Sequence, residues 1–368
     1  MDIRKFELLL DEIAVKIPAL SIAVGTGTDI PCCEYRGQIL ENAQVINNKS
    51  RFDIASLTKI FTGISFMKMC EEGFFCLDEP VCKYFSELNR KYPIEKAGVI
   101  IGEADARKIT WVNVLSHTTG MGWTREKTRP SLPHVHETLN DIFELPFAYE
   151  TGKKVVYSDL PIILMGKAME KVAERPLDKI VEDYVIGPLG LSETGYNRGN
   201  TTKDRDNFVP TEYDDVFRKQ RIWGAVHDEN AFLLDGVAAH AGIFSTVLDL
   251  CKLGIALNEA LRDGGLLKKE TMKMMIKEHF SDGEDRRGLI WQLSNVSGNT
   301  NAYTSVLSSS AYGHAGFTGC FMWMDPISDM TVVFLSNDIY NGRNCRKLFE
   351  YRLRILQAVN EIYGSSGK

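Results

Sequence analysis

The stretch Arg51-Phe-Asp-Ile-Ala-Ser-Leu-Thr-Lys-Ile60 places a serine one helical turn before a lysine, at the start of the apolar run 60–69. Residues i and i+3 of a helix face the same way, so Lys59 can reach the Ser56 hydroxyl. A serine hydroxyl is a poor nucleophile until a neighbouring base takes its proton. The run predicts a buried helix, whose first backbone N–H groups would stabilise an oxyanion. These ten residues therefore predict a serine nucleophile with a lysine partner.

The spacing alone is not specific, because Ser65 and Lys68 repeat it. Ser65 would lie in the middle of the helix, where its hydroxyl bonds to the backbone. For Ser56, the alternative is a helix-capping serine followed by a solvated lysine. A catalytic interpretation therefore needs partners elsewhere in the chain.

A first partner lies in residues 150–159, which predict a turn, a short β-prone run and a helix start with Pro161 in its first turn. Tyr157 precedes that helix. A tyrosine beside a lysine ammonium can act as a general base or proton shuttle. The alternative is a packing tyrosine, with Asp159 as an ordinary helix cap.

A second partner lies in residues 312–325, a glycine-punctuated segment that runs into an apolar strand. With residues 330–336 it predicts a β-hairpin closed at 325–329. His314 would project toward a substrate, and the N–H of Phe317 could join that of Ser56 in an oxyanion hole. His240-Ala-Gly242 has the same pattern, but His314 is preferred because it begins a strand.

Taken together, these motifs resemble those of the class C β-lactamase and penicillin-binding-protein-like serine hydrolases. Three further stretches, 114–121, 186–194 and 313–319, resemble phrases common in that family, and the resemblance spans nearly the whole chain. The three motifs occur in the family's order: Ser56-x-x-Lys59, Tyr157-x-Asp159 and His314-x-Gly316.

The resemblance implies an acyl-enzyme mechanism without a metal or cofactor. Ser56 would attack a carbonyl, Lys59 and Tyr157 would move the protons, and the N–H groups of Ser56 and Phe317 would bind the oxyanion. The same resemblance assigns substrate binding to three further residues: Asp159, His314 and Gly316.

Two departures from the β-lactamase pattern bear on the substrate, a small molecule or short peptide. His314 stands where β-lactamases carry a lysine, so the ammonium that attracts a penicillin carboxylate is missing. Asp159 replaces an asparagine and is an acceptor-only anion, which could offset Lys59, hold it in place or favour a substrate N–H. We therefore expect an ester or D-amino-acid or peptide amide hydrolase with weak or no β-lactamase activity. An acyltransferase, or a binding module with little turnover, is the alternative.

The distribution of patterns predicts an α/β (α+β) fold. Expected strands at 20–25, 43–47, 288–293, 319–323 and 331–336 cluster at the two ends of the chain, with amphipathic helices at 5–16 and 343–363. The middle is richer in helical patterns, such as 160–172 and 177–184. We expect an antiparallel sheet domain from residues 1–75 and 241–368, with a mostly helical domain at 76–240 inserted.

Composition fits a soluble enzyme: 368 residues, 44% hydrophobic, with a net charge of −6 that offers no basic footprint for nucleic acid. No apolar run approaches the length of a membrane helix. Residues 1–13 lack the features of a signal peptide, so we expect a cytoplasmic protein. Eight cysteines without Cys-x-x-Cys spacing argue against a zinc site. The role of residues 227–230, in substrate contact or internal hydrogen bonding, is open, and His117 is expected to brace a turn.

Overall fold

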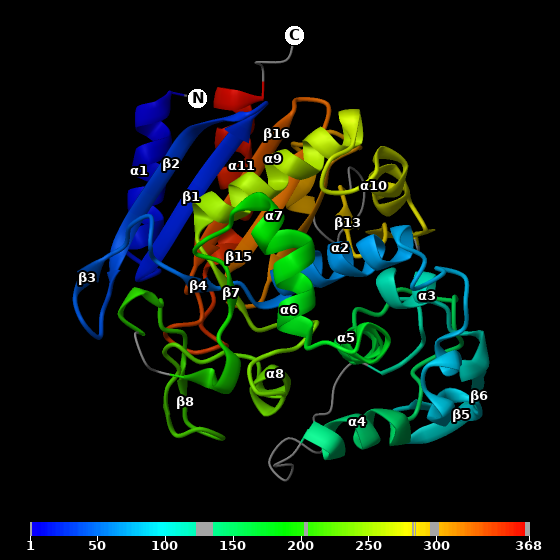
Figure 1. The fold of residues 1–368 in the computed structure, drawn as a ribbon. Helices are drawn as coiled ribbons and strands as arrows, with labels where there is room; N and C mark the ends of the chain where they lie inside the picture. The colour runs from blue at the N-terminus through cyan, green and yellow to red at the C-terminus, as the bar shows by residue number, and fades with distance from the viewer. Residues whose placement is uncertain are drawn as a thin grey trace.

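The main element of the fold is a nine-stranded antiparallel sheet (Figure 1). It comes from a computed structural model that describes residues 2–122, 135–201, 205–281, 283, 285–294 and 302–364. The strand order is β11-β12-β13-β14-β15-β16-β1-β2-β3, so the two ends of the chain meet where β16 pairs with β1. The strands are β1 (Ala19–Thr26), β2 (Asp29–Ile39), β3 (Gln44–Val45), β11 (Phe280–Ser281), β12 (Arg286–Arg287), β13 (Gln292–Leu293), β14 (Tyr312–Gly316), β15 (Cys320–Asp325) and β16 (Met330–Ser336).

Helices cover both faces of this sheet, because alternate residues of the central strands point to opposite sides. On one face, α1 (Ile3–Ala14) and α11 (Arg352–Tyr363) pack in a cluster that includes Leu20, Ile22 and Val24 of β1. On the other, Ala19 and Ala23 belong to the larger core, to which α9 (Val247–Asp263) and α10 (Lys269–Ile276) contribute. Figure 1 shows α9 crossing in front of the sheet.

The central part of the chain forms the second half of the molecule (Figure 1). The buried helix α2 (Thr58–Glu71) precedes this part in the chain but packs against its helices. The other helices are α3 (Trp111–Leu115), α4 (Val135–Glu144), α5 (Leu160–Ala173), α6 (Leu177–Val181), continued by a π-helical turn at Glu182–Ile186 into α7 (Gly187–Leu189), and α8 (Glu229–Leu233). Short strands form three small sheets: β5 (Lys91–Lys96) with β6 (Val99–Asp105), β8 (Tyr213–Asp214) with β9 (Gln220–Arg221), and β4 (Phe52–Asp53) with β10 (Ile243–Ser245) and β7 (Gly195–Tyr196).

The predicted fold class is confirmed, including the sheet built from both ends of the chain and the hairpin closed between Asp325 and Met330. The helix expected at 343–363 begins only at Arg352, because the preceding backbone folds around Asp338, whose carboxylate accepts the N–H groups of Lys347 and Leu348. Strand β2 was not predicted. The division at residues 76 and 240 stays a prediction, and the central segment holds several short strands besides its helices.

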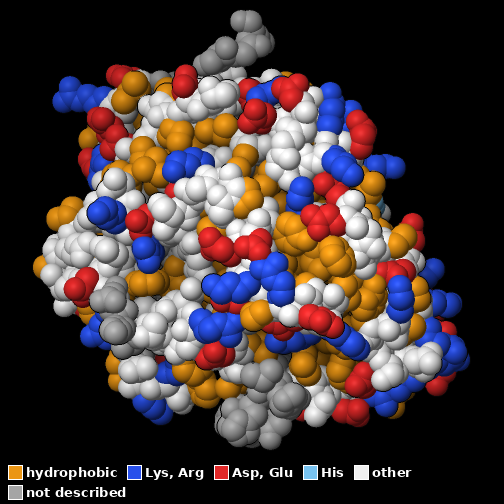
Figure 2. Space-filling model, viewed as in Figure 1, with side chains coloured by type: hydrophobic (Ala, Val, Ile, Leu, Met, Phe, Trp, Pro, Cys, Tyr) orange, Lys and Arg blue, Asp and Glu red, His pale blue; other side chains and the backbone are white. Residues whose placement is uncertain are grey.

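The outer surface mixes charges of both signs. On the face in Figure 2, Lys and Arg side chains lie interspersed with Asp and Glu. Among the residues that the structure describes, no helix combines the length and the apolar character needed to cross a bilayer.

Candidate active site

Ser56 lies in a single 3₁₀ turn, Ala55–Leu57, immediately before α2. Ala55 adopts a left-handed backbone with φ of 46°, which turns the chain sharply out of β4. The Asp53 carboxylate accepts the Ala55 N–H at 2.8 Å and braces this turn. Lys59 Nζ then lies 2.9 Å from Ser56 Oγ, as the i, i+3 spacing predicts.

Lys59 is fully buried, with 0% of its surface exposed, and its ammonium has three acceptors. Besides Ser56 Oγ, it contacts Asp159 Oδ1 at 2.7 Å and the carbonyl oxygen of His240 at 3.1 Å. Burial alone would lower the pKa of Lys59, but Asp159 and Tyr157 outweigh burial and raise it. In the resting arrangement Lys59 is therefore an ammonium whose three N–H groups all have acceptors.

Tyr157 and Asp159 lie at the start of α5, where Pro161 occupies the first turn as expected. Asp159 is the N-cap residue but makes no capping hydrogen bond; its carboxylate serves Lys59 instead. The Tyr157 ring centroid is 4.8 Å from Lys59 Nζ. Burial raises the pKa of the Tyr157 phenol, although Lys59 and Ser56 act in the opposite direction, so the phenol is protonated.

His314 lies in β14 and is buried, with its ring centroid 5.8 Å from that of Tyr157. Burial, Lys59 and Arg287 lower the pKa of His314 to about 3, which keeps it neutral. Its Nδ1 lies 2.8 Å from the Ala315 carbonyl, which can only accept, so Nδ1 carries the proton. Nε2 has no hydrogen-bond partner in the described structure and presents a lone pair.

Gly316 and Phe317 follow His314 at the end of β14. A Cβ on Gly316 would lie 2.5 Å from the Ile54 carbonyl oxygen, so glycine lets β14 pack directly against the Ser56 turn. Phe317 is 40% exposed, and its ring contacts both the imidazole of His227 and the guanidinium of Arg346.

Two residues that the sequence analysis did not assign to the site are His117 and Arg287. The Ser158 N–H donates to His117 Nδ1 at 3.3 Å, so His117 does brace a turn, but its ring also lies 4.5 Å from that of Tyr157. Burial, Arg287 and Lys59 hold the pKa of His117 well below its usual range. The Arg287 guanidinium lies 5.7 Å from the Tyr157 ring. The sequence signal for His117 is its place in the family-like stretch 114–121, whereas no sequence pattern pointed to Arg287.

Asp228 and His240 complete the surroundings of Lys59. His240 Nε2 lies 2.8 Å from Asp228 Oδ1, and although burial opposes it, His240 holds the pKa of Asp228 well below its usual range. One ligand atom each of Asp159, Asp228 and His240 lies within 4.8 Å of the others, a spacing that a metal ion could use. The donor set fits a cation poorly, because the Lys59 ammonium already pairs with Asp159.

The structure thus brings together the predicted Ser56, Lys59, Tyr157, Asp159 and His314 from three distant parts of the chain. A polarised serine, a lysine–carboxylate pair and a protonated phenol suit acyl transfer to and from a serine. The other Ser-x-x-Lys pair differs as expected, since Ser65 Oγ is buried and donates to the Phe61 carbonyl at 2.9 Å.

Comparison with known sequences gives a family match over most of the chain. The family model described as Beta-lactamase matches residues 12–357. A relative from Escherichia coli strain K12, provisionally named D-alanyl-D-alanine carboxypeptidase, is 30% identical over 336 residues, which cover 83% of this chain and 73% of that protein.

Solved structures show the same fold at lower identity. The octameric penicillin-binding protein homologue from Pyrococcus abyssi superposes with a TM-score of 0.74 at 21% identity, covering 99% of this chain and 78% of that one. EstCE1, described as a hydrolase with promiscuous acyltransferase activity, gives a TM-score of 0.72 at 20% identity, covering 96% and 97%.

Proposed function

This chain belongs to the Beta-lactamase family of serine hydrolases, and from that premise we propose that it cleaves an ester or a D-amino-acid or peptide amide through an acyl-enzyme on Ser56. The observation that carries the proposal is the 2.9 Å contact between Lys59 Nζ and Ser56 Oγ, with Asp159 behind the lysine. The E. coli relative named as a carboxypeptidase supports an amide substrate.

In the proposed acylation, Ser56 Oγ attacks the substrate carbonyl while Lys59, in its neutral form, takes the serine proton. The N–H groups of Ser56 and Phe317 bind the oxyanion. The Tyr157 phenol, kept protonated by its raised pKa, then donates a proton to the leaving group, and the Lys59 ammonium restores it. In deacylation, a water molecule attacks the acyl-enzyme carbonyl, the proton transfers run in reverse, and the acid leaves Ser56.

Substrate preference follows from His314, whose neutral imidazole presents a lone pair. In β-lactamases, a lysine ammonium at this position attracts the carboxylate of a penicillin. We therefore propose weak or no β-lactamase activity. An acyl acceptor other than water would make the same enzyme an acyltransferase, and the shared acyl-enzyme means that product analysis must separate the two.

The test is intact-mass spectrometry after incubation with a fluorophosphonate, a penicillin and a p-nitrophenyl ester, with Ser56→Ala beside the wild type. We expect a Ser56-dependent fluorophosphonate adduct and ester turnover with little penicillin turnover. Adding an alcohol acceptor distinguishes hydrolysis from acyl transfer by the ratio of acid to new ester. A folded wild-type protein that forms no adduct with any of the three would refute the proposal.

A further inference from the structure

Asp53 and His227 take no part in the proposed chemistry, yet both are buried at the junction of three segments of the site. We propose that they are positioning residues, which hold the Phe317 N–H opposite Ser56 and so set the geometry of the oxyanion hole. The inference rests on the proposed function and goes beyond it, because it assigns a role to residues that take no part in the proposed proton transfers or nucleophilic attack.

Asp53 connects the three segments through one side chain and one carbonyl. Its carboxylate accepts the Ala55 N–H at 2.8 Å and the His227 N–H at 2.7 Å, and its carbonyl accepts the Thr318 hydroxyl at 2.7 Å. Ala55 adjoins Ser56, and Thr318 adjoins Phe317. The residue is only 2% exposed, so these bonds are shielded from competing water.

His227 continues the connection through its ring. The imidazole stacks on the Phe317 ring, with centroids 5.5 Å apart and an interplanar angle of 18°. Its Nε2 lies 2.9 Å from Glu212 Oε1, and the Arg218 guanidinium donates to its carbonyl at 2.6 Å. The backbone and ring of His227 are therefore both fixed, and the fixed ring presents a flat surface to Phe317.

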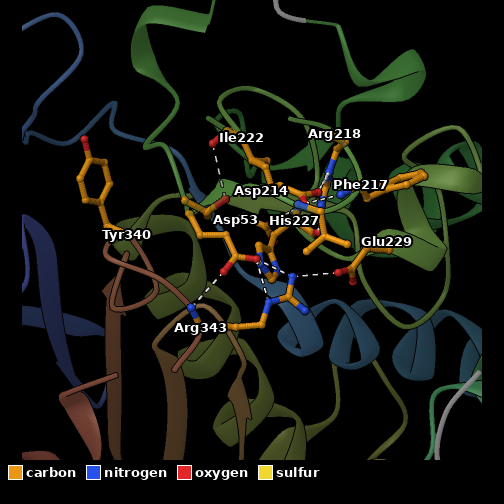
Figure 3. Close-up of polar contacts among 12 residues, drawn as sticks. Asp53, Asp214, Phe217, Arg218, Ile222, His227, Glu229, Tyr340 and Arg343 are labelled. Atoms are coloured by element: carbon orange, nitrogen blue, oxygen red, sulfur yellow. Dashed lines mark hydrogen bonds and ion pairs between the residues drawn. The ribbon is translucent and has the colours of Figure 1, made fainter. Parts of the chain in front are cut away.

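Glu212 and Arg343 hold the His227 end of this connection in place. The N–H and Nε of Arg343 each donate to Glu212 at 2.9 Å, and Nη2 reaches Glu229 at 2.8 Å. Figure 3 shows Arg343 extending toward Glu229, with Asp53 and His227 beside it. These anchors line a cavity of about 900 Å³, so the connection runs from the nucleophile's turn to the wall of that cavity.

Such a connection matters because an oxyanion donor works only at the position where the charge develops. Phe317 also contacts Arg346, whose guanidinium carbon lies 4.6 Å from the ring centroid. Removing the His227 ring would let Phe317 shift, and a displacement of about 1 Å can cost roughly 100-fold in rate.

The first test compares His227→Gln with His227→Phe in the full chain, using p-nitrophenyl ester turnover. Glutamine can still donate to Glu212 but loses the stacked ring, whereas phenylalanine keeps the ring. We expect His227→Gln to lower kcat roughly 10-fold or more with KM within about twofold, and His227→Phe to retain most of kcat. His279→Gln, a histidine outside the site, is the matched control.

A double-mutant cycle identifies the route of the effect. Phe317→Ala keeps its backbone N–H but removes the ring, so His227→Gln should cost nothing further in that background. Affinity for a boronic acid that forms a tetrahedral adduct on Ser56 should fall in parallel with kcat/KM. Additive losses in the cycle, or unchanged boronic acid affinity, would overturn the proposal.

Asp53→Asn tests the first link, because the amide keeps the shape but places an NH2 group against one of two backbone donors. We expect a loss of kcat similar to that of His227→Gln in protein that unfolds cooperatively. Full kcat in Asp53→Asn and His227→Gln, with turnover still dependent on Ser56, would refute the positioning role and leave the proposed hydrolase intact. No turnover in the wild type would instead count against the proposed function.

Discussion

Asp159 is the N-cap residue of α5, yet its carboxylate makes no capping hydrogen bond and lies 2.7 Å from the buried Lys59 ammonium. This choice of partner has a chemical reason. A buried ammonium without a counter-ion costs several kcal/mol, far more than an unmade cap. The pair therefore holds Lys59 protonated, and that fixes the pH range in which it can serve as a base.

Asp159→Asn should shift the acid limb of kcat/KM to lower pH. The carboxylate raises the pKa of Lys59 against the effect of burial, so removing its charge lets burial lower that pKa, and neutral Lys59 becomes available at lower pH. A pH–rate profile measures the shift. Asp178→Asn, which breaks the ion pair with Arg198 elsewhere, should leave the limb in place; an unmoved limb in Asp159→Asn would exclude Lys59 as the titrating base.

Ser56→Ala should reduce hydrolysis of any substrate by at least ~10³-fold, because the nucleophile is lost. Ser65→Ala should leave turnover within about twofold, since its hydroxyl donates to the Phe61 carbonyl within the helix, and it should cost about 1 kcal/mol in stability. Steady-state kinetics at equal folded fraction compares them. Similar losses in both would mean that the nucleophile is wrongly assigned.

Gly316→Ala should both destabilise the protein and reduce activity. The new Cβ would lie 2.5 Å from the Ile54 carbonyl oxygen, which can yield only by moving β14 away from the Ser56 turn, at a cost of about 1–3 kcal/mol. Thermal unfolding and ester turnover report the two effects. Gly102→Ala is the matched control, because its Cβ would meet only Ile94 Cδ1 at 3.8 Å; equal effects at both glycines would contradict the packing argument.

Glu212→Gln should flatten the loss of stability in acid. Although burial raises its pKa, His227 and Arg343 lower the Glu212 pKa from 4.5 to about 2. In the wild type, this lowered pKa stabilises the folded protein by on the order of 1–2 kcal/mol after solvent screening. The stabilisation is fully present above pH 4.5 and is lost as the pH falls toward 2. Denaturant unfolding at pH 6 and pH 3 gives the difference, which should shrink in the variant. Identical pH dependence in the two proteins would mean that Glu212 does not contribute.

Much of the fold could be predicted because the central strands near both ends of the chain are short, continuous apolar runs, which are buried along nearly their whole length. β2 was missed because Asp29–Ile39 mixes Pro, Gly and charged residues, most of its positions remaining at least partly exposed. Such a strand depends on its neighbour: β2 pairs with β1 along nearly its whole length. A strand that forms through tertiary pairing of this kind cannot be recognised from its local sequence alone.

The site was predicted where chemistry and local spacing coincide, as in Ser56 and Lys59. His240 shares the His-x-Gly pattern, and His314 was preferred because it begins a strand; only the fold reveals that the His240 carbonyl accepts from Lys59. Asp53 lies in the decisive stretch itself, but its partner His227 is 174 residues away. Contacts at that separation cannot be inferred from either segment alone.

The left-handed backbone of Ala55 has a consequence for directed evolution. At a φ of 46°, a β-branched side chain is strained, whereas glycine and asparagine accept the conformation readily. A saturation library at this codon, selected only for turnover, should therefore return a narrow set dominated by Gly, Ala and Asn, with Val, Ile and Thr absent. The residues selected at position 55 would then reflect the backbone conformation next to the nucleophile, and not a contact between the side chain and a substrate.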